Sequence, residues 1–229
     1  MNYILIISKL MLVVSLSFSH IIQAAVWTAG HGDLGIGYED GELEPHWHLG
    51  EDNEVVTLDG ASAPLGADGE EFEADEIIPE TNLLQTIGGT DYYVFPQNET
   101  PEVPFIGFGT EELEEDDWTG DIVLTLTGTT GPGNFFLFGQ DTFGATSTLM
   151  ASGSGGSISL APHSHTHHIW AFSQAGNYTL TFQVDGNHSS EGAKTTVGTT
   201  FGFTVVPEPS TAGLLLGVAV LALTVVRRR

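Results

Sequence analysis

The 229-residue chain has no cysteine and only five basic side chains, against 30 aspartates and glutamates. Without cysteine the chain has neither disulfides nor thiolates, so a packed core must supply its stability. Lys194 is the one basic residue between the two ends of the chain. A net charge of −25 repels nucleic acid and anionic membranes, which excludes a basic-patch binder and favours solubility or cation binding.

The sequence also lacks any amphipathic helical pattern between its two ends. It has instead short β-rich runs bounded by Gly and Pro, such as DIVLTLT at residues 121–127, in which apolar and polar positions alternate. These runs predict an all-β domain, an antiparallel β-sandwich of the Ig-like or jelly-roll-like kind, with a barrel as the alternative. Residues 57–89 and 97–118 are expected to be surface connections, because Gly, Pro and acidic residues dominate them.

The two ends carry apolar runs of different character. Residues 1–25 end in Ala24 and Ala25 after an interrupted apolar run, which predicts a cleavable secretory signal. Residues 207–229 hold an apolar segment long enough for a transmembrane helix with a cytoplasmic basic tip. The defining residues of this second segment are Pro207, Glu208, Pro209, Arg227, Arg228 and Arg229. Residues 26–206, roughly 180 in number, are then enough for one core.

A Pro-Glu-Pro, an apolar helix and an arginine tip, in this order at the chain end, resemble the PEP-CTERM sorting signal of exopolysaccharide-producing Gram-negative bacteria. The resemblance implies recognition by an exosortase-type membrane peptidase and removal of the helix. The protein would then be released or attached at the cell surface or in the extracellular matrix, and it would contact the membrane only through that helix before processing. Exopolysaccharide and other surface components are candidate partners.

Residues 30–181 carry a second resemblance, to the choice-of-anchor M domain, a surface-anchored module of secreted proteins. The resemblance implies a cell-surface β domain with no established reaction. This chain departs from the pattern by adding His163 and His168 and a longer acidic stretch before Asp91. The matching residues are Gly30, His31, Asp33, Tyr38, Asp40, Gly41, Leu43, Tyr93 to Gln97, Pro104, Gly107, Thr110, Glu111, Leu113, Gly131 to Gly133, Phe135, His165, His167, Trp170, Phe172, Gly176, Tyr178 and Thr181.

The histidine-rich stretch PHSHTHHIW at residues 162–170 is the clearest site-like feature. On an extended strand, side chains two residues apart share a face. His163, His165 and His167 are therefore expected to project together, while His168 and Trp170 point to the opposite face. One face of this strand can then bind a ligand while the other packs into the core.

Imidazoles two residues apart can reach one metal ion, and three or four nitrogen donors suit Zn²⁺ or Cu²⁺. We expect His165 and His167 to form a metal site with His31 and Asp33. The further candidate ligands are His46, His48 and His163. The alternative is that these histidines are solvated at the rim of a sheet and bind nothing specific.

Other chemistry has weaker support in the sequence. The acidic clusters at residues 66–76 and 111–117 lack the spacing of a calcium loop, so Ca²⁺ is less expected than a solvated acidic face. The chain has no G-x-S-x-G elbow, no H-E-x-x-H and no phosphate loop, so we expect a protein that is not an enzyme.

Three functions are compatible with these features. The first expectation is an exported structural or adhesion component of the cell surface or extracellular matrix that holds a histidine metal site. The alternatives are an extracellular metal-binding or metal-delivery protein and a metal-dependent extracellular hydrolase. If the histidines converge around an open coordination position, the two alternatives are favoured. A closed site or scattered histidines would favour the structural or adhesion component.

Overall fold

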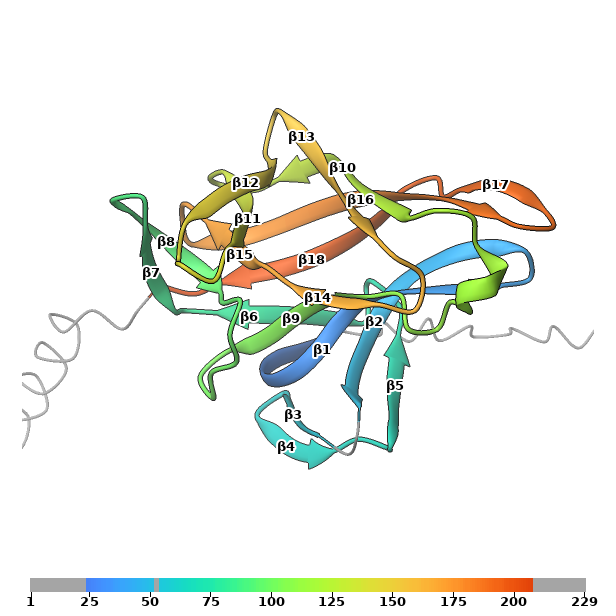
Figure 1. Ribbon diagram of the computed structural model, residues 1–229. Coiled ribbons are helices and arrows are strands. Elements are labelled where there is room, and N and C mark those ends of the chain that lie inside the picture. The colour runs from blue at the N-terminus through green and yellow to red at the C-terminus, as the bar shows by residue number, and fades with distance from the viewer. Residues whose placement is uncertain (1–23, 52–53, 208–229) are drawn as a thin grey trace, which may run out of the picture.

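The computed structural model describes residues 24–51 and 54–207, which form 18 β-strands and one short 3₁₀ turn, η1 (Glu115–Asp117) (Figure 1). The expectation of an all-β domain is confirmed. Within these residues no helix has the length and apolar character needed to cross a membrane. Apart from Ala24 and Ala25, the expected signal peptide lies outside the described residues, as does nearly all of the expected sorting signal with its transmembrane helix.

One sheet carries the histidines and is called the histidine sheet below. Its strands lie in the order β14 (His165–His167), β9 (Pro104–Gly109), β1 (Ala25–Glu39), β2 (Glu42–Glu51) and β5 (Asp68–Phe72). Strands β1 and β2 form a hairpin through Asp40 and Gly41, whose φ angles of 46° and 88° are those of a tight hairpin turn. Strand β9 reaches the other side of β1 from a distant part of the chain.

A second sheet, the opposing sheet, faces the histidine sheet across the core, and most of its strands lie above that sheet in Figure 1. Its strands follow the order β13 (Gly155–Leu160), β10 (Ile122–Thr130), β16 (Gly176–His188), β18 (Thr199–Val205) and β6 (Ile77–Thr81). The short β17 (Gly192–Thr195) pairs with the end of β16.

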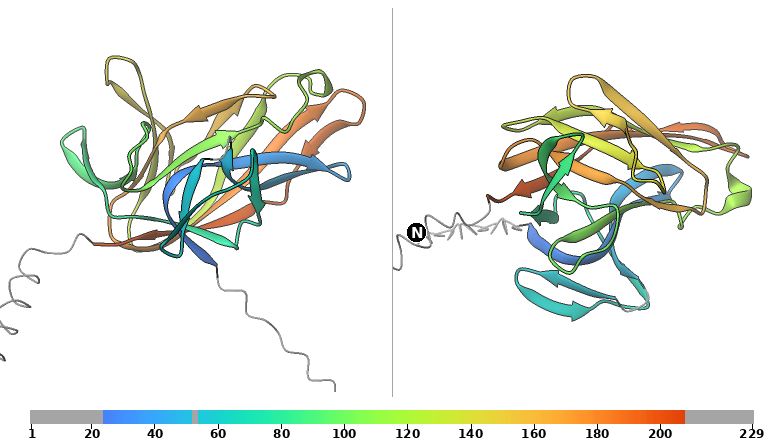
Figure 2. Two further views of the ribbon diagram at one scale, coloured as in Figure 1. Left: turned by 90° about the horizontal axis from the view of Figure 1, so that it is seen from below. Right: turned by 60° about the vertical axis from the view of Figure 1, so that its left-hand side comes forward.

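The remaining strands extend this framework at two places. A third sheet has the order β7 (Leu84–Ile87), β8 (Thr90–Phe95), β15 (Ile169–Phe172), β11 (Phe135–Gln140) and β12 (Thr146–Ala151), which pairs with β13. Strands β3 (Val55–Leu58) and β4 (Ala61–Pro64) join the beginning of β1, which also pairs with β6. The β7–β8 and β16–β17 hairpins lie at opposite ends of the molecule (Figure 2).

Aromatic side chains fill the space between the sheets. Trp47 of β2 meets Phe201 and Phe203 of β18 edge to face, with ring centroids 5.0 and 5.8 Å apart. Trp170 of β15 packs against Phe203 at 5.4 Å and stacks on Phe108 of β9 at 4.8 Å. All five side chains are buried, and such pairs add to the free energy gained by burying their area. One face of the histidine sheet is therefore core, and its other face is free for polar residues.

Two expectations about the fold are wrong. The sheets are not purely antiparallel, because β1 runs parallel to β6 and β9, and β18 runs parallel to β6. Parallel neighbours need long crossovers, which the segments between these strands provide. Residues 57–89 and 97–118 are not merely connections, because they contain β4 to β7 and β9. The burial of Ile106 and Phe108 outweighs the weak strand preference of the glycines in β9.

Candidate metal centres

The alternation of side chains along each strand separates apolar from metal-binding residue types. Leu34 and Ile36 of β1 and Trp47 of β2 point into the core and are fully buried. The residues between them point to the other face, as the two-residue period of a strand requires. The outward donors on these two strands are His31, Asp33, His46 and His48.

Strand register brings residues from distant parts of the chain to the same place. His165 and His167 of β14 pair with Gly109 and Gly107 of β9, and Gly107 in turn pairs with Asp33 of β1. The two histidines and Asp33 thus face each other across a strand that presents no side chain between them. This arrangement brings the histidines of β14 to β1, the first strand of the chain.

The glycines on this face make the room in which the donors converge. A Cβ atom at Gly107 would overlap the Asp33 carboxylate and lie 2.7 Å from His165 Nε2. A Cβ atom at Gly109 would lie 2.7 Å from Glu111 Oε2. Any larger residue would therefore fill the space between the donors. We use the name glycine floor for the four outward glycines Gly35, Gly37, Gly107 and Gly109.

The first centre consists of His31, Asp33, His165 and His167, and one donor atom of each lies within 4.8 Å of all the others. Asp33 Oδ1 is 3.2 Å from His165 Nε2 and 3.5 Å from His31 Nε2. A tetrahedral zinc ion with bonds of about 2.0–2.2 Å keeps its donors about 3.4 Å apart. These two distances fit such an ion.

Three buried atoms in the first centre lack a partner with hydrogen-bond geometry. They are His31 Nε2, Asp33 Oδ1 and His167 Nδ1. Buried polar atoms nearly always have a partner, so three such atoms in one cluster need an explanation. A cation held between the donors would satisfy His31 Nε2 and Asp33 Oδ1 directly.

Carboxylates behind the first centre orient two of its imidazoles. His31 Nδ1 lies 3.1 Å from Glu54 Oε2, and His165 Nδ1 lies 3.4 Å from Glu111 Oε1. Metal-bound histidines commonly use their second ring nitrogen in this way, which fixes the ring and makes it a better donor. The contacts leave both Nε2 atoms directed at Asp33 Oδ1.

The charges of the first centre are strongly coupled. The Asp33 carboxylate raises the pKa of His165, and it raises the pKa of His31 although burial alone would lower it. Burial would raise the pKa of Asp33, but the two imidazoles hold it well below its usual range. His167 stacks on Phe105 with ring centroids 3.7 Å apart, and burial lowers its pKa to about 4. His167 is therefore a neutral donor at neutral pH.

The second centre lies beside the first and consists of His46, His48 and Glu112. Glu112 Oε1 is 3.0 Å from His46 Nε2 and 3.2 Å from His48 Nδ1. The interaction with Glu112 raises the pKa of His48 to about 9. Burial would lower the pKa of His46, yet Glu112 raises it too. Burial would raise the pKa of Glu112, but the two imidazoles lower it to about 2.

The structure separates the predicted ligands into three groups. It brings together the four expected ligands of the first centre, His31, Asp33, His165 and His167. His46 and His48 share this face but form a separate centre, which corrects the expectation that they would join the first. His163 belongs to neither centre: its φ is 53°, it precedes β14, and its Nδ1 is 2.7 Å from the backbone carbonyl of Glu111.

Sequence reasoning did not single out Glu54 as part of a site. It missed the roles of Glu111 and Glu112 because the acidic run at residues 111–117 was interpreted as a solvated face. One signal was available for Glu111. It follows Gly107 and Gly109 at intervals of two residues, so it continues the outward face of β9. No comparable pattern marks Glu112, which reaches the second centre from the loop after β9.

The other sequence interpretations have clear outcomes among the described residues. Trp118 and Trp170 are 7% and 0% exposed, so both belong to the core. Five acidic side chains of residues 66–76 are exposed, as expected of a solvated acidic face: Asp68, Glu70, Glu71, Glu73 and Asp75.

Fold and site together describe an acidic β domain with two clusters of residues of metal-ligating types. Comparison with known families matches residues 205–229 to the PEP-CTERM protein-sorting motif. The motif implies export and membrane-anchored sorting toward the cell surface, with an exosortase as partner. The match does not extend over the β domain, so the resemblance to the choice-of-anchor M domain stays a prediction. No curated protein and no solved structure matches the chain.

Proposed function

We propose that the protein is a structural or adhesion component of the cell surface or extracellular matrix, whose β domain holds one Zn²⁺ or Cu²⁺ ion in the first centre. The sorting motif supports the location. Residues 26–206 would form the mature domain, with the aromatic side chains between the histidine and opposing sheets as its core. One observation carries the metal proposal: four donors converge, and three of these four residues have a buried, unpartnered polar atom.

The donor types favour a transition metal over calcium. Three imidazoles and one carboxylate suit Zn²⁺ or Cu²⁺, whereas Ca²⁺ takes six to eight oxygen atoms. Asp33 is 4% exposed, so its negative charge needs compensation in place. In the metal-free protein the protons of His31 and His165 supply that compensation, and an ion would displace them.

A closed site of this kind supports a role in the scaffold. Four protein donors complete the tetrahedral set of zinc, as in structural sites, and leave no position for a substrate. The ion would join β1 to β14, a strand of only three residues that contacts the sheet through β9. This arrangement is the reason to propose a protein that is not an enzyme and to rank the hydrolase last.

Metal binding or delivery as the purpose of the domain is the second candidate function. It is favoured by the side chain of His165, which is 29% exposed at the edge of the histidine sheet. An exposed ligand at an edge gives the ion a route in and out. The same first centre serves both candidates, which differ in how fast the ion exchanges.

Metal analysis of the full chain, purified without a histidine tag, tests the proposal. After loading with zinc and dialysis, the first centre should retain one ion, and the paired change His165→Ala with His167→Ala should abolish that ion. His163→Ala is the matched control, because His163 lies two residues away and outside the centre. If zinc or copper loading leaves no stoichiometric metal, or if the paired variant retains all of it, the proposal is wrong.

A further inference from the structure

The second centre has the outer contacts of a metal site. His46 Nδ1 contacts the backbone carbonyl of Glu44 at 3.0 Å, and His48 Nε2 contacts that of Asp68 at 2.8 Å. A carbonyl only accepts hydrogen bonds, so each of these nitrogens carries the proton of its ring. In the neutral imidazoles the lone pairs are then on His46 Nε2 and His48 Nδ1. Both of these nitrogens face Glu112 Oε1, so three donors point to one place.

Glycines also clear space around this second cluster. A Cβ atom at Gly35 would lie 2.9 Å from His46 Nε2, and one at Gly37 would lie 2.8 Å from Glu112 Oε2. The side chains of His46 and His48 are only 10% and 12% exposed, so they are held within the protein surface. The cluster therefore differs from an acidic patch, because it has two oriented imidazoles, one carboxylate and open space above Gly35 and Gly37.

We infer that His46, His48 and Glu112 bind a second divalent transition-metal ion, of the zinc class, independently of the first centre. The two centres share no ligand. Two histidines and one glutamate form the three-residue set found in zinc sites that keep a fourth position for an exchangeable ligand. The second centre is therefore open, in contrast to the closed first centre, and it is the part of the chain that can exchange a ligand or deliver its ion.

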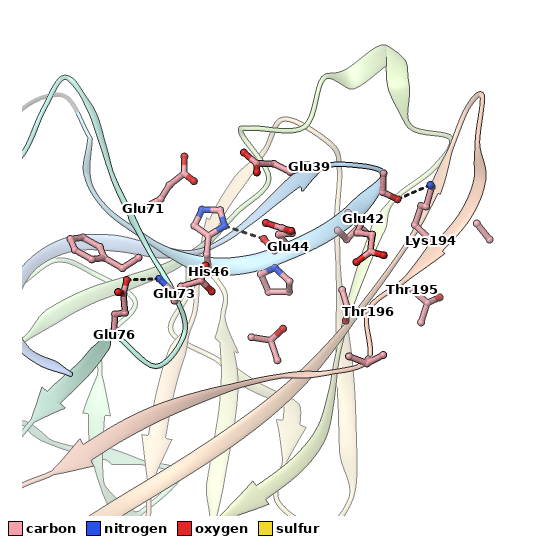
Figure 3. A pocket seen from close by; sticks show the side chains of 17 residues that line it. Glu39, Glu42, Glu44, His46, Glu71, Glu73, Glu76, Lys194, Thr195 and Thr196 are labelled. Carbon is pink, nitrogen blue, oxygen red and sulfur yellow. Dashed lines mark hydrogen bonds between the residues drawn. The ribbon is translucent and has the colours of Figure 1, made fainter. Parts of the chain in front are cut away.

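The surroundings of His46 are strongly acidic. His46 also lines a groove of about 800 Å³ (Figure 3). Six carboxylates border the groove, and Lys194 is the one basic residue among those that line it. The acidic residues are Glu39, Glu42, Glu44, Glu71, Glu73 and Glu76. Their negative potential concentrates cations and disfavours anions, so the fourth ligand is water or another neutral donor.

The test starts from the full chain in which His165→Ala and His167→Ala have removed the first centre. This paired variant should still bind one Zn²⁺ or Co²⁺ ion in a calorimetric titration. Adding Glu112→Gln should weaken that binding at least about 100-fold, since even the loss of an outer partner costs about 10- to 100-fold. Glu115→Gln, a nearby exposed carboxylate in η1, is the matched control and should leave binding unchanged. Circular dichroism confirms that each variant is folded.

The outcomes separate this inference from the proposed function. If the wild type binds one ion and the paired variant none, the second centre is not a metal site although the first centre stands. If the paired variant keeps its ion and Glu112→Gln loses it, the second centre is supported whatever happens at the first. Adding imidazole, a neutral ligand, to the Co²⁺-loaded paired variant should change its visible absorption. An unchanged spectrum contradicts the open position.

Discussion

Replacing Gly107 by alanine tests the idea that the glycine floor exists to hold an ion. The new Cβ would lie 2.7 Å from His165 Nε2, whereas an ordinary contact begins at 3.4 Å, so the imidazole must move by about 0.7 Å. A metal site tolerates about 0.2 Å in its ligand distances, so the displacement is more than three times the tolerance. The φ angle of Gly107 is not in the left-handed region, so the effect should come from the ligands and not from backbone strain.

We expect Gly107→Ala to fold, with a loss of about 1–3 kcal/mol of stability from overpacking. In the Glu112→Gln background, which leaves only the first centre, the change should lower the zinc affinity at least about 100-fold, because even the loss of an outer contact costs about 10- to 100-fold. Competition with a chromophoric chelator measures this affinity. The matched control is Gly202→Ala in β18, where the nearest atom to the new Cβ is 3.5 Å away. If the folded Gly107→Ala protein binds zinc as tightly as its Glu112→Gln parent, the glycine floor is not needed to hold the ion.

Three further predictions concern pH, the support of β14 and sorting. In the metal-free protein, the contribution of His48 to the free energy of unfolding is complete below about pH 6.5 and is lost as the pH rises through about 9. The contribution of Glu112 is lost at the other end, as the pH falls from about 4.5 to about 2. The Tm of chelated protein should show this alkaline loss, and His48→Asn should flatten it. Thr110 Oγ1 donates to the backbone carbonyl of Ala161 and accepts from the backbone N–H of Ser164, both in the turn before β14. Thr110→Val should therefore lower the free energy of unfolding in urea by about 1–3 kcal/mol, whereas Thr127→Val, at an exposed hydroxyl, should lower it less. Replacing Arg227, Arg228 and Arg229 by glutamine should leave unprocessed precursor, detected by its mass in fractionated cells; normal processing would contradict the role of the basic tip.

The faces of the strands could be predicted from the sequence because alternation is a local property of the backbone. It correctly put His165 and His167 on one side with Trp170 on the other, and His46 and His48 opposite Trp47. No pattern in the sequence predicts that these histidines lie close to His31 and Asp33. That prediction depended only on the residue types, which are ones that can bind the same metal ion.

The position of β9 could not be predicted, because nothing local distinguishes it from a loop. Pro104 begins the strand, and Gly107 and Gly109 are poor strand formers. The strand exists because Ile106 and Phe108 are buried in the core and because β1 and β14 pair with its two edges. These contacts join distant parts of the chain, so they cannot be inferred from the periodicity of neighbouring residues.

The errors at His163 and Glu112 have the same origin. A two-residue period extended back from His165 predicts that His163 shares its face. The chain instead turns there, because Thr110 holds the turn through hydrogen bonds to residues more than 50 positions away. Glu112 was assigned to a solvated acidic run, and only the loop after β9 brings it to the two histidines of β2.

X-ray absorption at the zinc edge, measured on the Glu112→Gln full chain loaded with one equivalent of zinc, identifies the ligands of the first centre directly, because this variant isolates that centre. We expect a four-coordinate ion with three imidazole nitrogens and one carboxylate oxygen at about 2.0–2.2 Å. Adding His165→Ala and His167→Ala should remove the imidazole signal. A spectrum of water oxygens without imidazole, or one that these two changes leave as it was, would contradict the proposal of a metal ion in the first centre.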